Sequence, residues 1–128
     1  MVLRWPLRIN EERRDGVLVL VLAGRLGTAS ALQFDAAVAD AVLRGDRRLV
    51  IDLKGVDYVS GAGLKALATA AGACAEARGS LALCELAEPV RIARDLGGLL
   101  AELPVERSRD DAIARVVGAA GPETWPET

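Results

Sequence analysis

The sequence predicts one α/β domain built on a mixed sheet of about four to five strands, with about four helices. The first reason is size, because a chain of 128 residues that is 52% hydrophobic can bury one core but not two. The second reason is the order of the elements along the chain, because strand-like and helix-like segments alternate with short connections. We therefore expect a single domain over residues 1–120, an opening antiparallel hairpin followed by mostly parallel pairing, and a frayed tail at 121–128.

The chain begins as a β-hairpin. Leu7 to Arg14 mixes polar and apolar residues, and Asp15-Gly16 supplies the turn. Val17 to Ala23 is then a continuous apolar run, which is typical of a strand buried on both faces.

A helix is expected from Thr28 or Ser30 to about Leu43. Ser30 and Gln33 stand at capping-box spacing, in which each side chain binds a free backbone N–H of the first turn. Apolar residues recur at helical spacing, so one face should pack against the sheet. That face is expected to be the stripe of Leu32, Ala36, Ala39 and Leu43, with Phe34, Val38 and Val42 beside it.

The second half alternates strands with helices. Arg48 to Leu53 is a buried parallel strand, Gly55 to Val59 a loop, and an alanine-rich helix runs from about Ala62 to Arg78-Gly79. The remaining elements are expected to be a strand at Ser80–Cys84, a helix at Pro89–Leu96, an edge strand at Leu103–Val105 and a helix capped by Ser108-x-x-Asp111 that runs to about Ala119.

Composition excludes several function classes. The chain has no histidine, which removes histidine-based catalytic triads and the common zinc sites, so we expect neither catalysis nor a metal or cofactor. With 16 basic and 18 acidic residues and few aromatic ones, it lacks the features of a nucleic-acid-binding protein. The longest apolar run is too short for a signal peptide or a membrane span, which favours a cytoplasmic protein without membrane insertion. Cys74 and Cys84 lie in apolar stretches and are expected to be buried thiols.

Two interpretations are open for Asp52 and Asp57, which lie near one expected loop. A pair of carboxylates can serve as acid and base when their surroundings separate their pKa values. The favoured interpretation is that Asp52, at the end of its strand, accepts N–H bonds and supports the loop, while Asp57 is exposed.

The most informative segment runs from Tyr58 to Lys65, where four consecutive small residues precede a helix. They leave the helix N-terminus, with its free N–H groups and partial positive charge, open to an anion or a partner backbone. Ser60 is expected to be the N-cap. A capping hydroxyl in this position stays accessible, so a structural and a functional role can coexist.

At this segment the sequence resembles the STAS family, the domain of bacterial anti-sigma factor antagonists and of sulfate-transporter cytoplasmic tails. The resemblance extends from Leu7 to about Ala119. It rests on the strand of Val17–Ala23 followed by Gly24-Arg25-Leu26, the Leu49–Leu53 strand, the Tyr58–Leu64 junction and the Leu103-Pro104-Val105 edge.

The resemblance implies a stand-alone antagonist that binds a serine-kinase anti-sigma factor and is released when a serine at the start of the second helix is phosphorylated. A phosphatase is a further implied partner. The common junction Asp-Ser-Ser-Gly-Leu falls on Ser60 to Leu64, so Ala62 stands at the usual phosphoacceptor position. Ser60 is the hydroxyl left at the junction and is therefore the phosphorylation candidate.

We expect the partner to contact the turn after the second strand and the mouth of the second helix. The expected contacts are Gly24, Arg25, Thr28, Ser60, Gly61, Ala62, Gly63 and Lys65. Two other hypotheses stay open, namely a STAS scaffold subunit of a signalling assembly or a membrane transporter complex, and an enzyme acting through Asp52 and Asp57. The sequence leaves the oligomeric state undecided.

Overall fold

The computed structural model describes residues 7–98 and 103–118, which form five strands and four helices. The strands lie in the order β1-β2-β3-β4-β5. The antiparallel hairpin is followed by parallel pairs, which confirms the predicted α/β class. The strands are β1 (Leu7–Arg14), β2 (Val17–Leu26), β3 (Arg48–Val59), β4 (Ser80–Cys84) and β5 (Val105–Glu106). The helices are α1 (Thr28–Leu43), α2 (Gly61–Glu76), α3 (Glu88–Gly97) and α4 (Arg109–Gly118).

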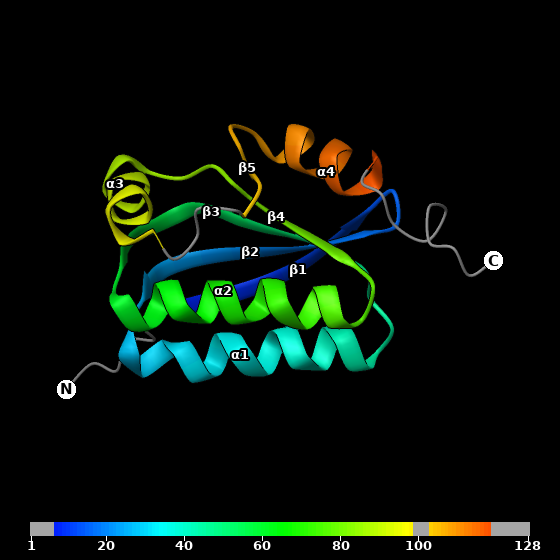
Figure 1. Cartoon of the computed structure of the whole chain (residues 1–128), viewed down its shortest axis with the longest axis horizontal. Helices are drawn as coiled ribbons and strands as arrows, with labels where there is room; N and C mark the ends of the chain where they lie inside the picture. Colours follow the sequence, from blue (N-terminus) through cyan, green and yellow to red (C-terminus); the bar gives the residue numbers. More distant parts are fainter. Residues whose placement is uncertain (1–6, 99–102, 119–128) are drawn as a thin grey trace.

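Helices cover both faces of the sheet. Figure 1 shows α1 and α2 side by side on one face, α4 on the other and α3 at one end. The alternation of side chains along β2 follows these layers: Leu18, Leu20 and Leu22 join the core beneath α1 and α2, whereas Val17 and Val19 join the core beneath α4. This two-sided burial is why β2 is apolar from Val17 to Ala23.

Strands β2 and β3 are longer than predicted. The expected loop at Gly55–Val59 is wrong, because β3 continues to Val59 beside a β2 that continues to Leu26. The ladder is irregular at two points, where β3 has one more residue than β2. The first irregularity places Leu53 and Lys54 opposite Leu22, and the second leaves Asp57 unpaired. The glycine that suggested a loop instead allows two strands to approach closely, since a side chain on Gly55 would press on Ala23.

The start of α1 also differs from the prediction. Gly27 is the N-cap, and its N–H donates to the hydroxyl of Ser30 at 3.0 Å, so Ser30 occupies the third helical position and does not cap with Gln33. The Gln33 side chain instead donates to the carbonyl of Leu7 on β1. The capping box of Ser30 and Gln33 would make Ser30 the N-cap. The observed N-cap is Gly27, so the helix begins about one turn earlier than that spacing predicted.

The packed face of α1 was predicted wrongly. Leu32 and Leu43 are 77% and 86% exposed, and Ala36 and Ala39 are also exposed. The buried residues are Ser30, Phe34, Val38 and Ala41. Because α1 is apolar on more than one side, periodicity could not choose between its stripes. The sheet and α2 decide which one is covered.

The C-terminal elements match the prediction with small shifts. The edge strand is Val105–Glu106 and not Leu103–Val105. The Ser108 hydroxyl accepts the Asp111 N–H at 3.0 Å, which confirms the predicted cap of α4. The expected end of this helix at Ala119 and the expected tail at 121–128 lie outside the described residues. Within the described part of the chain, no helix is long and apolar enough to cross a membrane.

Both cysteines are buried, as predicted. Burial raises the pKa of the Cys74 thiol to about 11. It raises the pKa of the Cys84 thiol to about 12, with the nearby carboxylates of Asp52 and Glu85 contributing.

We therefore predict that neither thiol of the native protein reacts with Ellman's reagent at pH 8, because each lacks both access and thiolate character. Absorbance of the released thionitrobenzoate measures the reaction. The same protein in guanidinium chloride should react at both cysteines, and fast native reaction at either one would contradict the packing.

Candidate partner-binding site

The end of β2 and the start of α2 are in direct contact. The Ser60 N–H donates to the carbonyl oxygen of Leu26 at 3.0 Å. Gly63 lies against the same carbonyl, where a Cβ atom would overlap the oxygen and approach Val59 Cγ1 to 2.9 Å. Only a glycine at this position allows the first turn of α2 to pack on β2. The two segments that we expected a partner to contact therefore lie next to each other.

Ser60 is the N-cap of α2, as predicted. Its hydroxyl oxygen accepts the N–H of Gly63 at 3.2 Å, and its carbonyl accepts the N–H of Leu64 at 2.9 Å. The residue is half-buried. In residues 7–98 and 103–118, its hydroxyl donates no hydrogen bond to a protein group.

The N-termini of α1 and α2 converge beside Ser60. The two helices run side by side and begin at the same end of the molecule (Figure 1). A Cβ atom on Gly27, the N-cap of α1, would lie 3.7 Å from Ser60 Oγ and 3.7 Å from Tyr58 Cε2. Neither helix has an acidic residue in its first turn. Two positive helix ends therefore meet in one place without a carboxylate of their own to offset them.

An arginine and a tyrosine border these helix ends. The guanidinium of Arg25 lies 4.4 Å from the centre of the Tyr58 ring, a cation–π contact between paired residues of β2 and β3. Tyr58 is 42% exposed. The predicted contacts did not include Tyr58, although it is the single tyrosine of the chain and stands beside the run of small residues. The sequence signal that could have identified Tyr58 as a contact residue was its aromatic side chain.

The predicted contact residues divide into two groups. Arg25, Thr28, Gly61 and Lys65 are exposed, and Ala62 is half-buried. These five, with Tyr58 and Ser60, are called the helix mouth below. Gly63 is buried and Gly24 is a half-buried residue of β2 with a φ of +114°, so both act within the fold.

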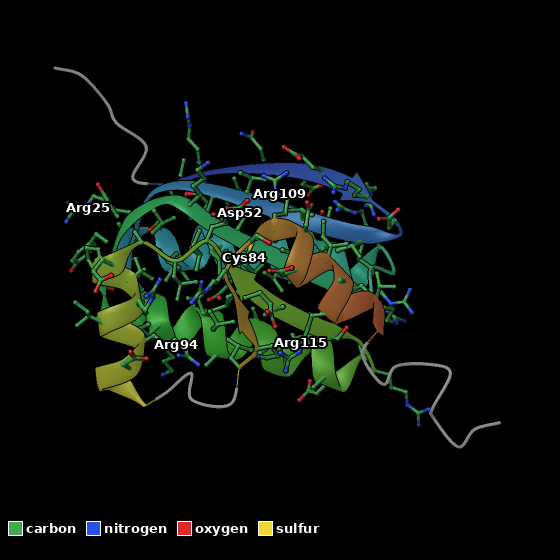
Figure 2. The ribbon with its side chains drawn as sticks, turned by 90° about the horizontal axis from the view of Figure 1, so that it is seen from above. Arg25, Asp52, Cys84, Arg94, Arg109 and Arg115 are labelled. Atoms are coloured by element: carbon green, nitrogen blue, oxygen red, sulfur yellow. The ribbon has the colours of Figure 1, made fainter. Side chains whose placement is uncertain are left out.

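Asp52 lies apart from the helix mouth. It is buried, and its carboxylate accepts the Lys54 N–H at 2.9 Å and the Nε–H of Arg109 at 2.9 Å. Figure 2 shows Asp52 and Arg109 together over the sheet, while Arg25 lies at the end of the molecule. The carboxylate supports a bulge of β3 and not a loop, and both of its oxygens are engaged. Asp57 is exposed and unpaired in the ladder.

Comparison with known proteins places these features in a family. Residues 8–112 match the STAS domain. The chain belongs to the STAS domain family. This STAS protein is 37% identical over 108 residues to a protein of Bordetella bronchiseptica that bears the name "Putative anti-sigma factor antagonist BtrV". That match covers 84% of this chain and 93% of BtrV.

Two solved structures share the fold. An anti-sigma factor antagonist from Mycobacterium paratuberculosis superposes with a TM-score of 0.78 and 27% identity, covering 87% of this chain and 94% of that one. The phosphorylated form of the Bacillus cell-fate determinant SpoIIAA superposes with a TM-score of 0.64 and 17% identity. That match covers 85% of this chain and 99% of SpoIIAA.

We predict that Gly63→Ala destabilises the protein by roughly 2 to 3 kcal/mol, because the new methyl group collides with the Leu26 carbonyl and α2 must move. Gly61→Ala is the matched control, since a Cβ there meets nothing within 4 Å. Its effect should stay within about 0.5 kcal/mol. Urea unfolding followed by circular dichroism measures both variants, and equal effects would contradict the close contact.

Proposed function

We propose that this STAS protein is an anti-sigma factor antagonist that acts in the cytoplasm by binding a serine-kinase anti-sigma factor through the helix mouth. The observation that carries the proposal is its 37% identity to BtrV over 93% of the length of that protein. The antagonist from Mycobacterium paratuberculosis adds support, because its similarity extends over nearly the whole fold.

The chemistry of the helix mouth suits an acidic protein surface. Two helix N-termini meet there, and Arg25 and Lys65 add two exposed positive side chains. The exposed Tyr58 ring supplies the apolar contact area on which binding hot spots depend. The small residues Gly61 and Ala62 let a partner backbone approach the first turn of α2 closely. A partner that presents carboxylates or carbonyl oxygens would complement this surface.

Phosphorylation of Ser60 is the proposed switch. A phosphate would add about −1.5 to −2 charges at pH 7, next to two helix N-termini that stabilise it. The same charge would repel the acidic partner surface that the unmodified mouth attracts. Ala62 removes the usual phosphoacceptor of the family, and Thr28 is the other aliphatic hydroxyl of the helix mouth. A phosphatase would restore the binding-competent form.

The burial and hydrogen bonds of Asp52 favour a regulatory function over an enzymatic one. An acid–base pair needs a carboxylate that can exchange protons with a substrate. Asp52 is buried and accepts hydrogen bonds from Lys54 and Arg109, so a substrate has little access to its oxygens. We therefore propose that the domain is acted on by a kinase and carries out no catalysis itself.

The first test is intact-mass analysis after incubation with the candidate anti-sigma kinase and ATP. We expect the native protein and Thr28→Ala to gain one phosphate and Ser60→Ala to gain none, because Ser60 is the hydroxyl at the start of α2. Loss of the cap in Ser60→Ala costs about 1 kcal/mol, which leaves the domain folded. A phosphate that persists in Ser60→Ala would exclude this residue as the acceptor.

The second test is binding of the unmodified protein to the kinase, measured by isothermal titration calorimetry. Ser60→Glu should weaken binding by about tenfold or more, since it places a negative charge where the partner is acidic. Arg25→Ala should weaken binding as well, because it removes a positive charge and frees the Tyr58 ring. The exposed control Arg8→Ala on β1 should bind normally. Absence of any complex with the native protein would overturn the proposed function.

The exposed leucines of α1 favour a second candidate, a scaffold subunit of a larger assembly. Leu32 and Leu43 are exposed on the stripe of α1 that faces away from the core. Exposed apolar patches often mark contacts between proteins. Light scattering after size-exclusion chromatography distinguishes the two. A stable oligomer that dissociates in Leu32→Ser with Leu43→Ser would support the scaffold, whereas a monomer at all concentrations would favour the antagonist.

A further inference from the structure

A cavity of about 520 Å³ opens between α3 and the start of α4, away from the residues of the helix mouth. In Figure 2, α3 and α4 stand on either side of β5. The cavity walls come from the ends of β4 and β5, from a bulge of β3 and from α3. The lining residues that matter below are Lys54, Glu85, Ala87, Arg91, Glu106 and Arg107. The carboxyl ends of parallel strands are the usual place for ligands in an α/β sheet.

The basic side chains of the cavity are not paired with a carboxylate in the described part of the chain. Among the residues that the structure describes, the side chains of Lys54, Arg91 and Arg107 form no ion pair or hydrogen bond. This contrasts with the arginines on β1 and α4 that are paired, such as Arg13 with Asp46 and Arg115 with Glu106. The cavity therefore brings together three positive charges that are free to meet a ligand.

The two carboxylates in the lining already have partners. Glu106 is paired with Arg115 on α4 at 2.7 Å. Glu85 accepts the backbone N–H of Arg109 at 3.3 Å. These contacts hold both groups toward α4 and offset part of their charge. The three basic side chains outnumber these two carboxylates, so the lining keeps a net positive charge.

The N-terminus of α3 reinforces this field. Its N-cap is Ala87, which lines the cavity and has no side chain able to bind the free N–H groups of the first turn. The first hydrogen bond of the helix joins the Arg91 N–H to the Ala87 carbonyl. The free N–H groups of this turn add partial positive charge at the wall where Arg91 also lies, and Glu88 in the same turn offsets part of it.

We propose that this cavity binds a small phosphorylated ligand, a soluble molecule that carries a phosphate or diphosphate group. Guanidinium groups bind phosphate oxygens with two parallel hydrogen bonds, and Arg91 and Arg107 supply two such groups from different elements. Lys54 adds a point charge from a third element. The volume lies in the range of small-molecule sites and leaves room for an organic portion beyond the phosphate. The site goes beyond the antagonist function, because none of its residues belongs to the helix mouth.

The test is a titration of the ¹⁵N-labelled protein with inorganic pyrophosphate, followed by ¹H–¹⁵N NMR at constant ionic strength. We expect saturable shifts of the backbone amides at 85–91 and 105–107, and smaller shifts at Ser60 and Gly61. Arg91→Gln and Arg107→Gln should each weaken binding by about tenfold, because each removes a charge-assisted contact with the phosphate. Both residues are exposed and unpaired among the described residues, so neither change should unfold the domain. Arg8→Gln, which removes an equal charge from β1, should leave the affinity unchanged.

Three results would overturn the proposal. One is the absence of saturable shifts at 85–91 and 105–107. Another is an equal response to Arg8→Gln and Arg91→Gln, which would indicate a general attraction of anions to the surface. The third is a shift pattern centred on the helix mouth. Sodium chloride at matched ionic strength is the control titration, and the same shifts with chloride would also count against a phosphate site.

Discussion

The contact between the Leu26 carbonyl and the first turn of α2 is the constraint on which the helix mouth depends. That oxygen accepts the Ser60 N–H and leaves room only for the hydrogen of Gly63. A strand and a helix rarely approach so closely, because a side chain usually separates them. Here the missing side chain brings the start of α2 against the end of β2. As a direct result, the half-buried Ser60 is held at the start of α2, where its hydroxyl caps the helix.

The same contact explains why the helix mouth is electropositive. Parallel strands β2 and β3 end at the same edge, so the helices that follow them begin there. The N-caps Gly27 and Ser60 consequently lie close together, and the irregular end of β3 aligns Tyr58 with Arg25. The partial charges of both helices and a guanidinium thus act at one place. A single phosphate at Ser60 could reverse the sign of this surface without any rearrangement of the fold.

The sequence predicted elements whose signals are local. The turn at Asp15-Gly16, the Ser60 cap and the Ser108 cap each depend on a few adjacent residues, and the structure contains all three. Prediction failed where burial depends on what packs from outside. The stripe with Leu32 and Leu43 had the spacing of a core face, yet α2 and the sheet cover the stripe with Phe34 and Val38 instead. The strand extension through Gly55 was missed because glycine indicates a loop unless a neighbouring strand needs the space.

The sequence by itself therefore determined the α/β class, the order of the elements, the buried cysteines and the chemical character of the Ser60 junction. These follow from periodicity, local capping and composition, which act over a few residues. Only the tertiary structure decided which face of α1 is exposed, that the two helix N-termini meet, and that Lys54, Arg91 and Arg107 surround one cavity. These features join residues far apart in the chain, and their positions depend on strand register and on close packing between layers, which no local pattern encodes.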